Sequence, residues 1–186
     1  MNESKPMNNR CGASSEPLVS ESNEAWLSLV FRENVVPLMG YVTHLMGDAD
    51  RAGDVVQDAF VRLCKQPRDH VEGRVRQWLY TVCRNRALDI LKREKRMKTL
   101  DDGHACHQES RDTDPQIQVQ HRESAAKAGS LMKKLPSRQQ EVIRLKVQSG
   151  LSYREISELT GLSVSNVGYL LHTGLKTIRN RLATIE

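Results

Sequence analysis

The chain has 186 residues, of which 38% are hydrophobic, 27% are charged and 4% are aromatic, and its formal net charge is +5 at pH 7. A chain of this length can form one or two small domains, and its basic excess favours a polyanionic partner such as nucleic acid. Because the chain has no run of about 18 apolar residues and its polar N-terminus lacks an apolar signal core, we expect a cytoplasmic protein without membrane insertion.

The N-terminal part of the chain predicts a tail followed by a long helix. Residues 1–22 are rich in Ser, Asn, Glu and Pro and show no periodicity, which predicts a disordered tail. After Trp26, apolar residues recur at steps of three and four, at Leu29, Val30, Val36, Met39, Val42 and Met46. This spacing predicts an amphipathic helix that ends near Gly47 and bends at Pro37. Similar periodic segments follow without strand-like alternation, so we predict an all-α fold.

A second helix is predicted to begin after Asp48, whose side chain can cap its N-terminus. Its buried stripe consists of Val55, Val56, Ala59, Phe60 and Leu63. Asp50, Asp54 and Asp58 follow at steps of four on the opposite side, where each like-charge pair costs about 0.3 kcal/mol. Such an acidic row is either a solvated face or a docking site for a basic partner. The residues alone favour the solvated face.

The segment from Gln66 to Arg76 is polar, contains Pro67 and Gly73, and is predicted to be a loop. A third helix is predicted from Gln77 to about Met97, with packing residues at Trp78, Leu79, Val82 and Cys83. Its later part is strongly basic, with Arg84, Arg86, Lys92, Arg93, Lys95, Arg96 and Lys98. A local excess of this kind is typical of a phosphate-binding surface, and we favour it over a merely solubilising helix end.

Residues 99–116 are polar and lack apolar periodicity, which predicts a flexible linker. The linker contains His104, Cys106 and His107, three residue types that bind zinc, but no fourth ligand stands at a recognisable spacing. We therefore predict no metal and no cofactor. The cysteines form no CxxC pair, which argues against a disulfide framework, and Cys64 and Cys83 are expected to be small core residues.

The C-terminal block, residues 117–186, predicts a helical domain that ends in a helix-turn-helix. One helix is expected up to Leu135, a second over Arg138–Gln148, and two more within Leu151–Leu182. Gly161 can adopt the left-handed backbone conformation that ends a helix and reverses the chain. The reversal lets one apolar set pack against another: Ile156, Leu159 and Leu162 against Val167, Leu170 and Leu171.

The last helix would start with short polar side chains, Ser163, Ser165 and Asn166, which can reach base edges or phosphates in a major groove. The alternative is a plain helical hairpin in which these residues only form the turn. Gly168 and Gly174 each cost this helix about 1 kcal/mol relative to alanine. They are therefore expected to allow a close approach either to DNA or to protein.

Two stretches of the sequence resemble one known family. LPSRQQEVIRLKVQSGLSYREISELTGLSVSNV resembles region 4 of sigma factors, and GDADRAGDVVQDAFVRLCK followed by RQWLYTVCRNRALDILKREKR resembles region 2. Two such domains without other sigma regions are the plan of the extracytoplasmic-function (ECF) group of the sigma-70 family. The resemblance implies a region 2 domain over residues 23–98, a linker over 99–116 and a region 4 domain over 117–186.

The resemblance also implies a function and its contact residues. Such proteins bind core RNA polymerase, direct it to promoter DNA and are not enzymes. By analogy, the acidic helix would dock on the polymerase clamp through Asp54, Gln57 and Asp58. The −10 element would be held by Arg74, Arg76, Arg84, Asn85, Arg86, Lys92, Arg93 and Arg96. The −35 element would be read by Arg154, Ser163, Ser165, Asn166, Tyr169, His172 and Lys176.

The recognition helix departs from the family pattern because it carries few basic residues. We therefore expect it to make few contacts to DNA phosphates. This keeps two alternatives open. One is a stand-alone helix-turn-helix regulator that binds an operator as a dimer. The other is a sigma-like decoy that holds polymerase or an anti-sigma factor without reading DNA. An anti-sigma factor is also a further partner that the resemblance allows.

Overall fold

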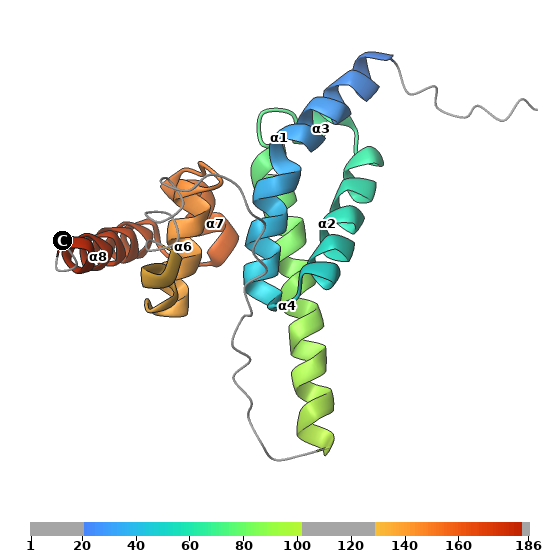
Figure 1. Cartoon of the computed structure of the whole chain (residues 1–186). Coiled ribbons are helices and arrows are strands. Elements are labelled where there is room, and N and C mark those ends of the chain that lie inside the picture. The colour runs from blue at the N-terminus through green and yellow to red at the C-terminus, as the bar shows by residue number, and fades with distance from the viewer. Residues whose placement is uncertain (1–20, 102–128, 184–186) are drawn as a thin grey trace, which may run out of the picture.

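The computed structural model describes residues 21–101 and 129–183, and every regular element in these ranges is a helix, which confirms the all-α fold (Figure 1). The helices form an N-terminal bundle (α1–α4) and a C-terminal bundle (α6–α8). Their bounds are α1 Glu21–Met46, α2 Ala49–Cys64, α3 Arg68–Val71, α4 Val75–Asp101, α6 Ser137–Val147, α7 Tyr153–Thr160 and α8 Val164–Ala183. No helix in these two ranges is long and apolar enough to cross a bilayer. Most of the predicted tail and linker, including His104, Cys106 and His107, lies outside the described residues.

The N-terminal bundle packs α1, α2 and α4 around one core. Its fully buried residues include Leu38, Val42, Ala59, Leu79 and Cys83. The predicted cap of α2 is confirmed, because the Asp48 carboxylate accepts hydrogen bonds from the backbone N–H groups of Asp50 (3.0 Å) and Arg51 (3.1 Å). The predicted stripe of α2 is also buried, apart from Phe60, which is half-buried.

The predicted apolar face of α1 is partly wrong. Leu29 is 47% exposed and Val36 is 74% exposed, whereas Leu38 and Tyr41 are buried. Since successive residues of a helix are rotated by about 100°, Val36 lies about 200° around the axis from Leu38 and cannot share its face. Cys64 is exposed as well, contrary to prediction, because it stands at the C-terminal end of α2.

The segment predicted as a loop before the basic helix contains the short helix α3. Within it, Val71 is 1% exposed and anchors the segment in the core, while Arg68 pairs with Glu72 at 2.6 Å one turn later. Helix α4 then begins at Val75, slightly earlier than predicted, and continues to Asp101, into the stretch predicted as linker. Its C-terminal part projects beyond the rest of the bundle (Figure 1).

The helix-turn-helix of the C-terminal bundle forms as predicted. Gly161 has φ +74° and ends α7, and the Ser163 hydroxyl accepts a hydrogen bond from the backbone N–H of Asn166 at 3.2 Å. The predicted apolar contact is confirmed: Ile156, Leu159, Val167 and Leu171 are buried, and Leu162 and Leu170 pack partly buried against them. A capping box of Ser152 and Glu155 starts α7 and was not predicted, although its S-x-x-E pattern is readable in the sequence.

The two glycines of α8 have different surroundings. A Cβ atom added at Gly174 would lie 2.8 Å from Cδ1 of Ile143, so the missing side chain lets α8 cross α6 closely. A Cβ at Gly168 would meet only the Tyr153 ring at 3.7 Å, an ordinary contact. The close approach expected at Gly174 is therefore an approach to protein within the same bundle.

Candidate functional site

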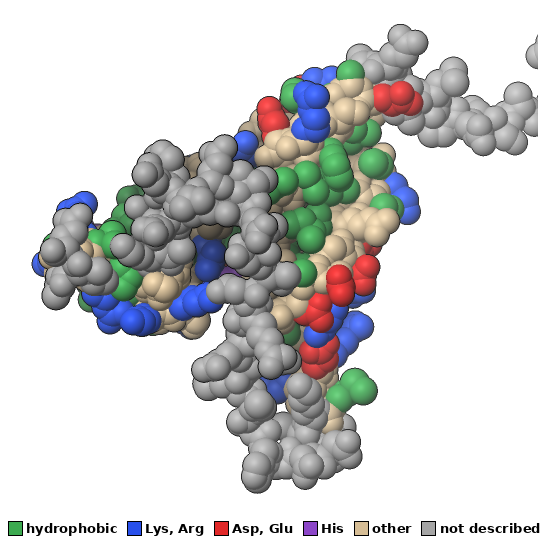
Figure 2. Space-filling model, in the orientation of Figure 1, with side chains coloured by type: hydrophobic (Ala, Val, Ile, Leu, Met, Phe, Trp, Pro, Cys, Tyr) green, Lys and Arg blue, Asp and Glu red, His purple; other side chains and the backbone are tan. Residues whose placement is uncertain are grey.

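The acidic side of α2 is the first candidate surface. Asp54 and Gln57 are exposed on it, and Asp58 is half-buried. The Asp58 carboxylate lies 2.9 Å from the Arg62 guanidinium and 3.9 Å from that of Arg86 on α4. Figure 2 shows acidic side chains gathered on the part of the N-terminal bundle where α2 and α4 lie, next to basic ones. The structure thus brings the three predicted residues onto one accessible face, with Asp58 already paired.

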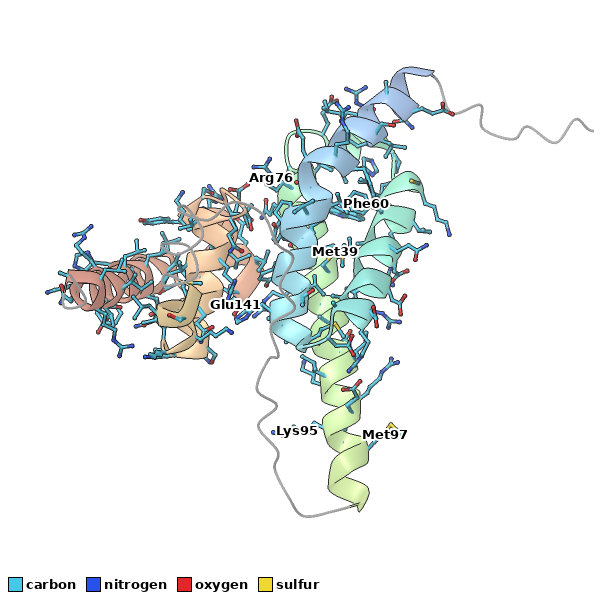
Figure 3. The ribbon with its side chains drawn as sticks, viewed as in Figure 1. Met39, Phe60, Arg76, Lys95, Met97 and Glu141 are labelled. Atoms are coloured by element: carbon cyan, nitrogen blue, oxygen red, sulfur yellow. The ribbon has the colours of Figure 1, made fainter. Side chains whose placement is uncertain are left out.

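The predicted −10 residues on α4 and just before it fall into two groups. Asn85, Lys92, Arg93 and Arg96 are exposed, and the last three lie on the projecting part of the helix, which Figure 3 marks with Lys95 and Met97. Arg86 is half-buried beside Asp58, and the acidic Glu94 forms an ion pair with Arg51 of α2. The projecting part therefore offers a positive surface to solvent, as a phosphate-binding surface requires.

The second group, near the start of α4, is engaged by other residues. Arg74 donates from its guanidinium to the His70 carbonyl, at 3.0 and 3.2 Å, within the α3 segment. Arg84 donates from Nε to Oε1 of Glu141 on α6 at 2.8 Å. Arg76 donates to the side-chain oxygen of Asn34 at 3.2 Å and, through Nη1, to a backbone carbonyl of the C-terminal bundle at 3.3 Å. Arg76 and Arg84 thus lie where the two bundles meet.

The recognition face of α8 carries exposed polar side chains at steps of three and four. They are Ser165, Asn166, Tyr169, His172 and Lys176, and all are exposed on the helix. Ser163 differs, because its hydroxyl is used as the helix cap. Arg154 on α7 is exposed and pairs with Glu158 at 3.2 Å. The face thus offers hydrogen-bonding groups and one lysine to a groove.

Both bundles match one protein family. Residues 30–97 match Sigma-70 region 2, and residues 126–178 match Sigma-70, region 4. The chain belongs to the sigma-70 family. Its relatives place it in the ECF group, and as a sigma factor it binds core RNA polymerase and directs it to promoters for transcription initiation. The stand-alone regulator accounts less well for the presence of both regions in one chain.

Similar proteins share most of the length of this sigma factor. RNA polymerase sigma factor SigZ of Bacillus subtilis is 25% identical over 147 residues, which cover 78% of this chain and 81% of SigZ. ECF RNA polymerase sigma factor SigE of Mycolicibacterium smegmatis is 25% identical over 161 residues, which cover 86% of this chain but 62% of the longer SigE. The fold is similar to that of the sigma factor RpoE in complex with the anti-sigma factor NepR from Bartonella quintana, with TM-score 0.64 and 18% identity over 88% of this chain and 98% of that one.

Sequence reasoning missed the residues that join the two bundles of this sigma factor. Glu141 of α6 accepts hydrogen bonds from Tyr41 of α1 and from Arg84, and Gln77 of α4 donates to Glu158 of α7 at 2.7 Å. Tyr41 and Glu141 are 100 positions apart. No local periodicity links residues at that separation, so only the three-dimensional structure reveals the contact.

Proposed function

We propose that this sigma factor uses three separate surfaces: the acidic face of α2 for polymerase, the basic side of α4 for the −10 element and the polar face of α8 for the −35 element. The observation that carries the proposal is that all three surfaces lie on one chain that matches both sigma regions. The protein itself performs no bond chemistry, since polymerase supplies catalysis, and it acts in the cytoplasm.

The polymerase surface is centred on Asp54, Gln57 and Asp58. The two exposed residues contribute a carboxylate and an amide that a basic partner can approach without breaking an existing contact. Asp58 can exchange its pairing with Arg62 for a cation on the partner, because an exposed ion pair contributes less than about 1 kcal/mol. Charge complementarity of this kind sets the orientation and the rate of docking.

The −10 surface combines the α3 segment with the basic side of α4, from Arg74 to Arg96. Promoter melting needs a base to leave the stack, which costs a few kcal/mol and has to be offset by contacts to the base and its flanking phosphates. Asn85, Lys92, Arg93 and Arg96 are exposed on α4 and supply hydrogen bonds and positive charge. Arg76, Arg84 and Arg86 would join them after leaving their present partners.

The −35 surface is the exposed face of α8. Asn166 lies in its first turn, where a recognition helix commonly contacts base edges, and Tyr169 is 66% exposed one turn later. Lys176 of α8 and Arg154 of α7 supply phosphate contacts. Since so few cations are present, we expect −35 binding to depend on hydrogen bonds more than on counterion release.

A protein partner is expected to regulate this activity. The sigma factor RpoE from Bartonella quintana was solved with the anti-sigma factor NepR, and its likeness in fold extends over both bundles. An anti-sigma factor is therefore the class of regulator we propose to look for.

Run-off transcription tests the function directly. Purified core polymerase and this protein are incubated with a fragmented genomic library, and the start sites are sequenced. Defined starts that share two spaced upstream elements are the expected result. Binding to core polymerase without any start would favour the decoy, whereas binding of a palindromic duplex without core would favour the stand-alone regulator.

A further inference from the structure

The first three turns of α8 present one accessible face, formed by Ser165, Asn166, Tyr169 and His172. Since successive residues of a helix are rotated by about 100°, these side chains fall within an arc of about 120° around the axis. Among the described residues, Asn166 and Tyr169 form hydrogen bonds through their backbone groups only. Figure 1 shows α8 on the side of the C-terminal bundle away from the N-terminal bundle. Both side chains are therefore available to a duplex.

The edges of the bases determine which side chains can distinguish them in the major groove. Arginine or lysine pairs with O6 and N7 of guanine, and aspartate or glutamate accepts a hydrogen bond from N4 of cytosine. Asparagine or glutamine pairs with N6 and N7 of adenine, and apolar groups contact the methyl group of thymine. The side chains of a recognition helix therefore limit the base pairs that the helix can select.

Helix α8 lacks the side chains that select guanine and cytosine. Its sequence from Val164 to Ala183 contains no aspartate and no glutamate, and its first cation is Lys176. At about 1.5 Å per residue, Lys176 lies about 15 Å further along the axis than Asn166, which exceeds the width of the major groove, about 12 Å. A straight helix leaves the curved groove over such a length. Lys176 is therefore placed at the phosphates when Asn166 contacts a base.

Two cations on the neighbouring helices are engaged elsewhere. Lys146 of α6 donates to the Leu151 carbonyl at 3.1 Å and lies 5.5 Å from the centre of the Tyr153 ring. Arg154 of α7 pairs with Glu158 at 3.2 Å, and the first helix of a helix-turn-helix crosses the DNA backbone instead of entering the groove. These two cations thus do not supply the guanine contact that α8 lacks.

Asn166 and Tyr169 fit an adenine and a thymine on neighbouring base pairs. The Asn166 amide carries both the donor and the acceptor that N7 and N6 of adenine require. Tyr169 is 66% exposed and follows about 4.5 Å further along the axis, close to the step of about 3.4 Å between base pairs, and its ring offers an apolar surface. Ser165 can bond to several bases and His172 offers a single hydrogen bond, so neither discriminates as a bidentate pair does.

We propose that this sigma factor reads its −35 element at A·T base pairs, with Asn166 paired to an adenine and Tyr169 packed on the methyl group of a thymine in a neighbouring pair. No side chain of α8 then selects a G·C pair. The inference rests on the proposed −35 role of α8 and adds the bases that the helix selects.

A promoter library with a randomised −35 element tests the base preference. Holoenzyme assembled from core polymerase and this protein transcribes the library, and the transcribed templates are sequenced. Adenine at one position and thymine at a neighbouring position are each expected to be enriched about tenfold. Asn166→Ala is expected to abolish the first preference and Tyr169→Ala the second. Enrichment of a G·C pair that either variant abolishes would overturn the proposal.

Modified bases identify the atoms that are contacted. 7-Deazaadenine lacks the N7 acceptor, and deoxyuridine lacks the methyl group of thymine. At the selected positions, the first is expected to lower transcription by wild-type holoenzyme about tenfold and the second about fourfold. Asn166→Ala is expected to be insensitive to the first and Tyr169→Ala to the second. Equal losses in wild type and in the matching variant would overturn the assigned contacts.

Asn166→Arg tests the same position by a gain of function, because arginine pairs with guanine. The variant is expected to exchange the adenine preference for a guanine preference at the same position. Ala183→Arg is the matched control, since it adds the same charge at the exposed end of α8 and is expected to leave the preference unchanged. An Asn166→Arg variant that keeps the wild-type preference at every position would overturn the proposal.

Failure of the proposed function has a different signature. If wild-type holoenzyme starts no transcript from any template, the protein is not an active sigma factor under these conditions. Selection of randomised duplexes by the full-length protein alone then decides the base preference. Enriched A·T pairs that are lost in Asn166→Ala would support the assignment, whereas an enriched G·C pair or no enriched sequence would overturn it.

Discussion

Asp58 has electrostatic surroundings that Asp54 does not share, although both belong to the acidic row of α2. Asp58 lies between Arg62 and Arg86, whereas Asp54 is exposed. A sequence pattern identifies the row but not the cations that approach it from α4. The acidic face was therefore predictable from spacing, and the pairing of one of its members was not.

Asp58→Lys is expected to weaken binding to core polymerase about tenfold, because the new cation would repel a basic docking surface. Asp54→Lys is expected to act in the same direction without disturbing an ion pair in the fold. Binding is measured by fluorescence anisotropy of labelled sigma factor titrated with core enzyme. Glu33→Lys is the charge-matched control, and unchanged affinity in both α2 variants would remove this face from the interface.

Asn166→Ala is expected to spare core binding and to reduce transcription from cognate promoters about tenfold, the loss of one good base contact. The substitution keeps the backbone N–H that Ser163 caps, so the helix start is unaffected. Ser163→Ala provides the comparison, since it removes the cap at a cost of about 1 kcal/mol of stability. Equal run-off transcript levels from wild type and Asn166→Ala would exclude a role in −35 recognition.

At the scale of elements, helices with strong periodicity and caps were predictable. The Asp48 cap, the stripe of α2 and the turn at Gly161 depend on neighbours within a few residues, and these predictions are confirmed. The face of α1 and the helix α3 were missed. Burial of Tyr41 and of Val71 is decided by packing against distant helices, which a local pattern does not contain.

The glycines of α8 allow a matched test of helix packing. Gly168→Ala is expected to raise the free energy of unfolding by up to about 1 kcal/mol, because alanine favours helix and finds room beside Tyr153. Gly174→Ala is expected to lower it by about 1 kcal/mol, because the new methyl group clashes with the buried Ile143. Urea unfolding followed by circular dichroism measures both.

Ile143→Val removes the Cδ1 atom that the new methyl group would meet and is expected to relieve the clash. In a double-mutant cycle, the two substitutions should therefore cost less together than the sum of their separate costs. If the two losses in free energy of unfolding are strictly additive, the contact with Cδ1 of Ile143 is not the reason that position 174 requires glycine.

At the scale of the whole molecule, the interface includes a histidine with a perturbed pKa. Burial, and then the nearby Arg144, lower the pKa of His44 from its ordinary 6.5 to about 4, while Glu141 opposes and Lys133 adds to the shift. The folded form, in which the two bundles are in contact, therefore favours the neutral imidazole. Because the unfolded chain binds the proton more readily, the stability contributed by neutral His44 is complete above pH 6.5 and is lost as pH falls towards 4.

The stability of wild-type protein is accordingly expected to fall more steeply between pH 6.5 and 4 than that of His44→Asn, which cannot titrate. Urea unfolding at several pH values measures this difference, and the carboxylates that also titrate contribute equally to both proteins. If the free energy of unfolding depends on pH in the same way in both proteins, folding does not lower the pKa of His44.

The length of α4 limits how far apart the two bundles can lie. Since the helix continues to Asp101, only residues 102–128 connect it to the described part of the C-terminal bundle, and a chain segment of that length spans at most about 95 Å. Confinement within this radius gives each bundle a local concentration of the other of at least about 0.5 mM. The contact between the two bundles is therefore equally favoured in dilute and in concentrated solutions of the protein, and its extent does not depend on how much of the protein a cell makes.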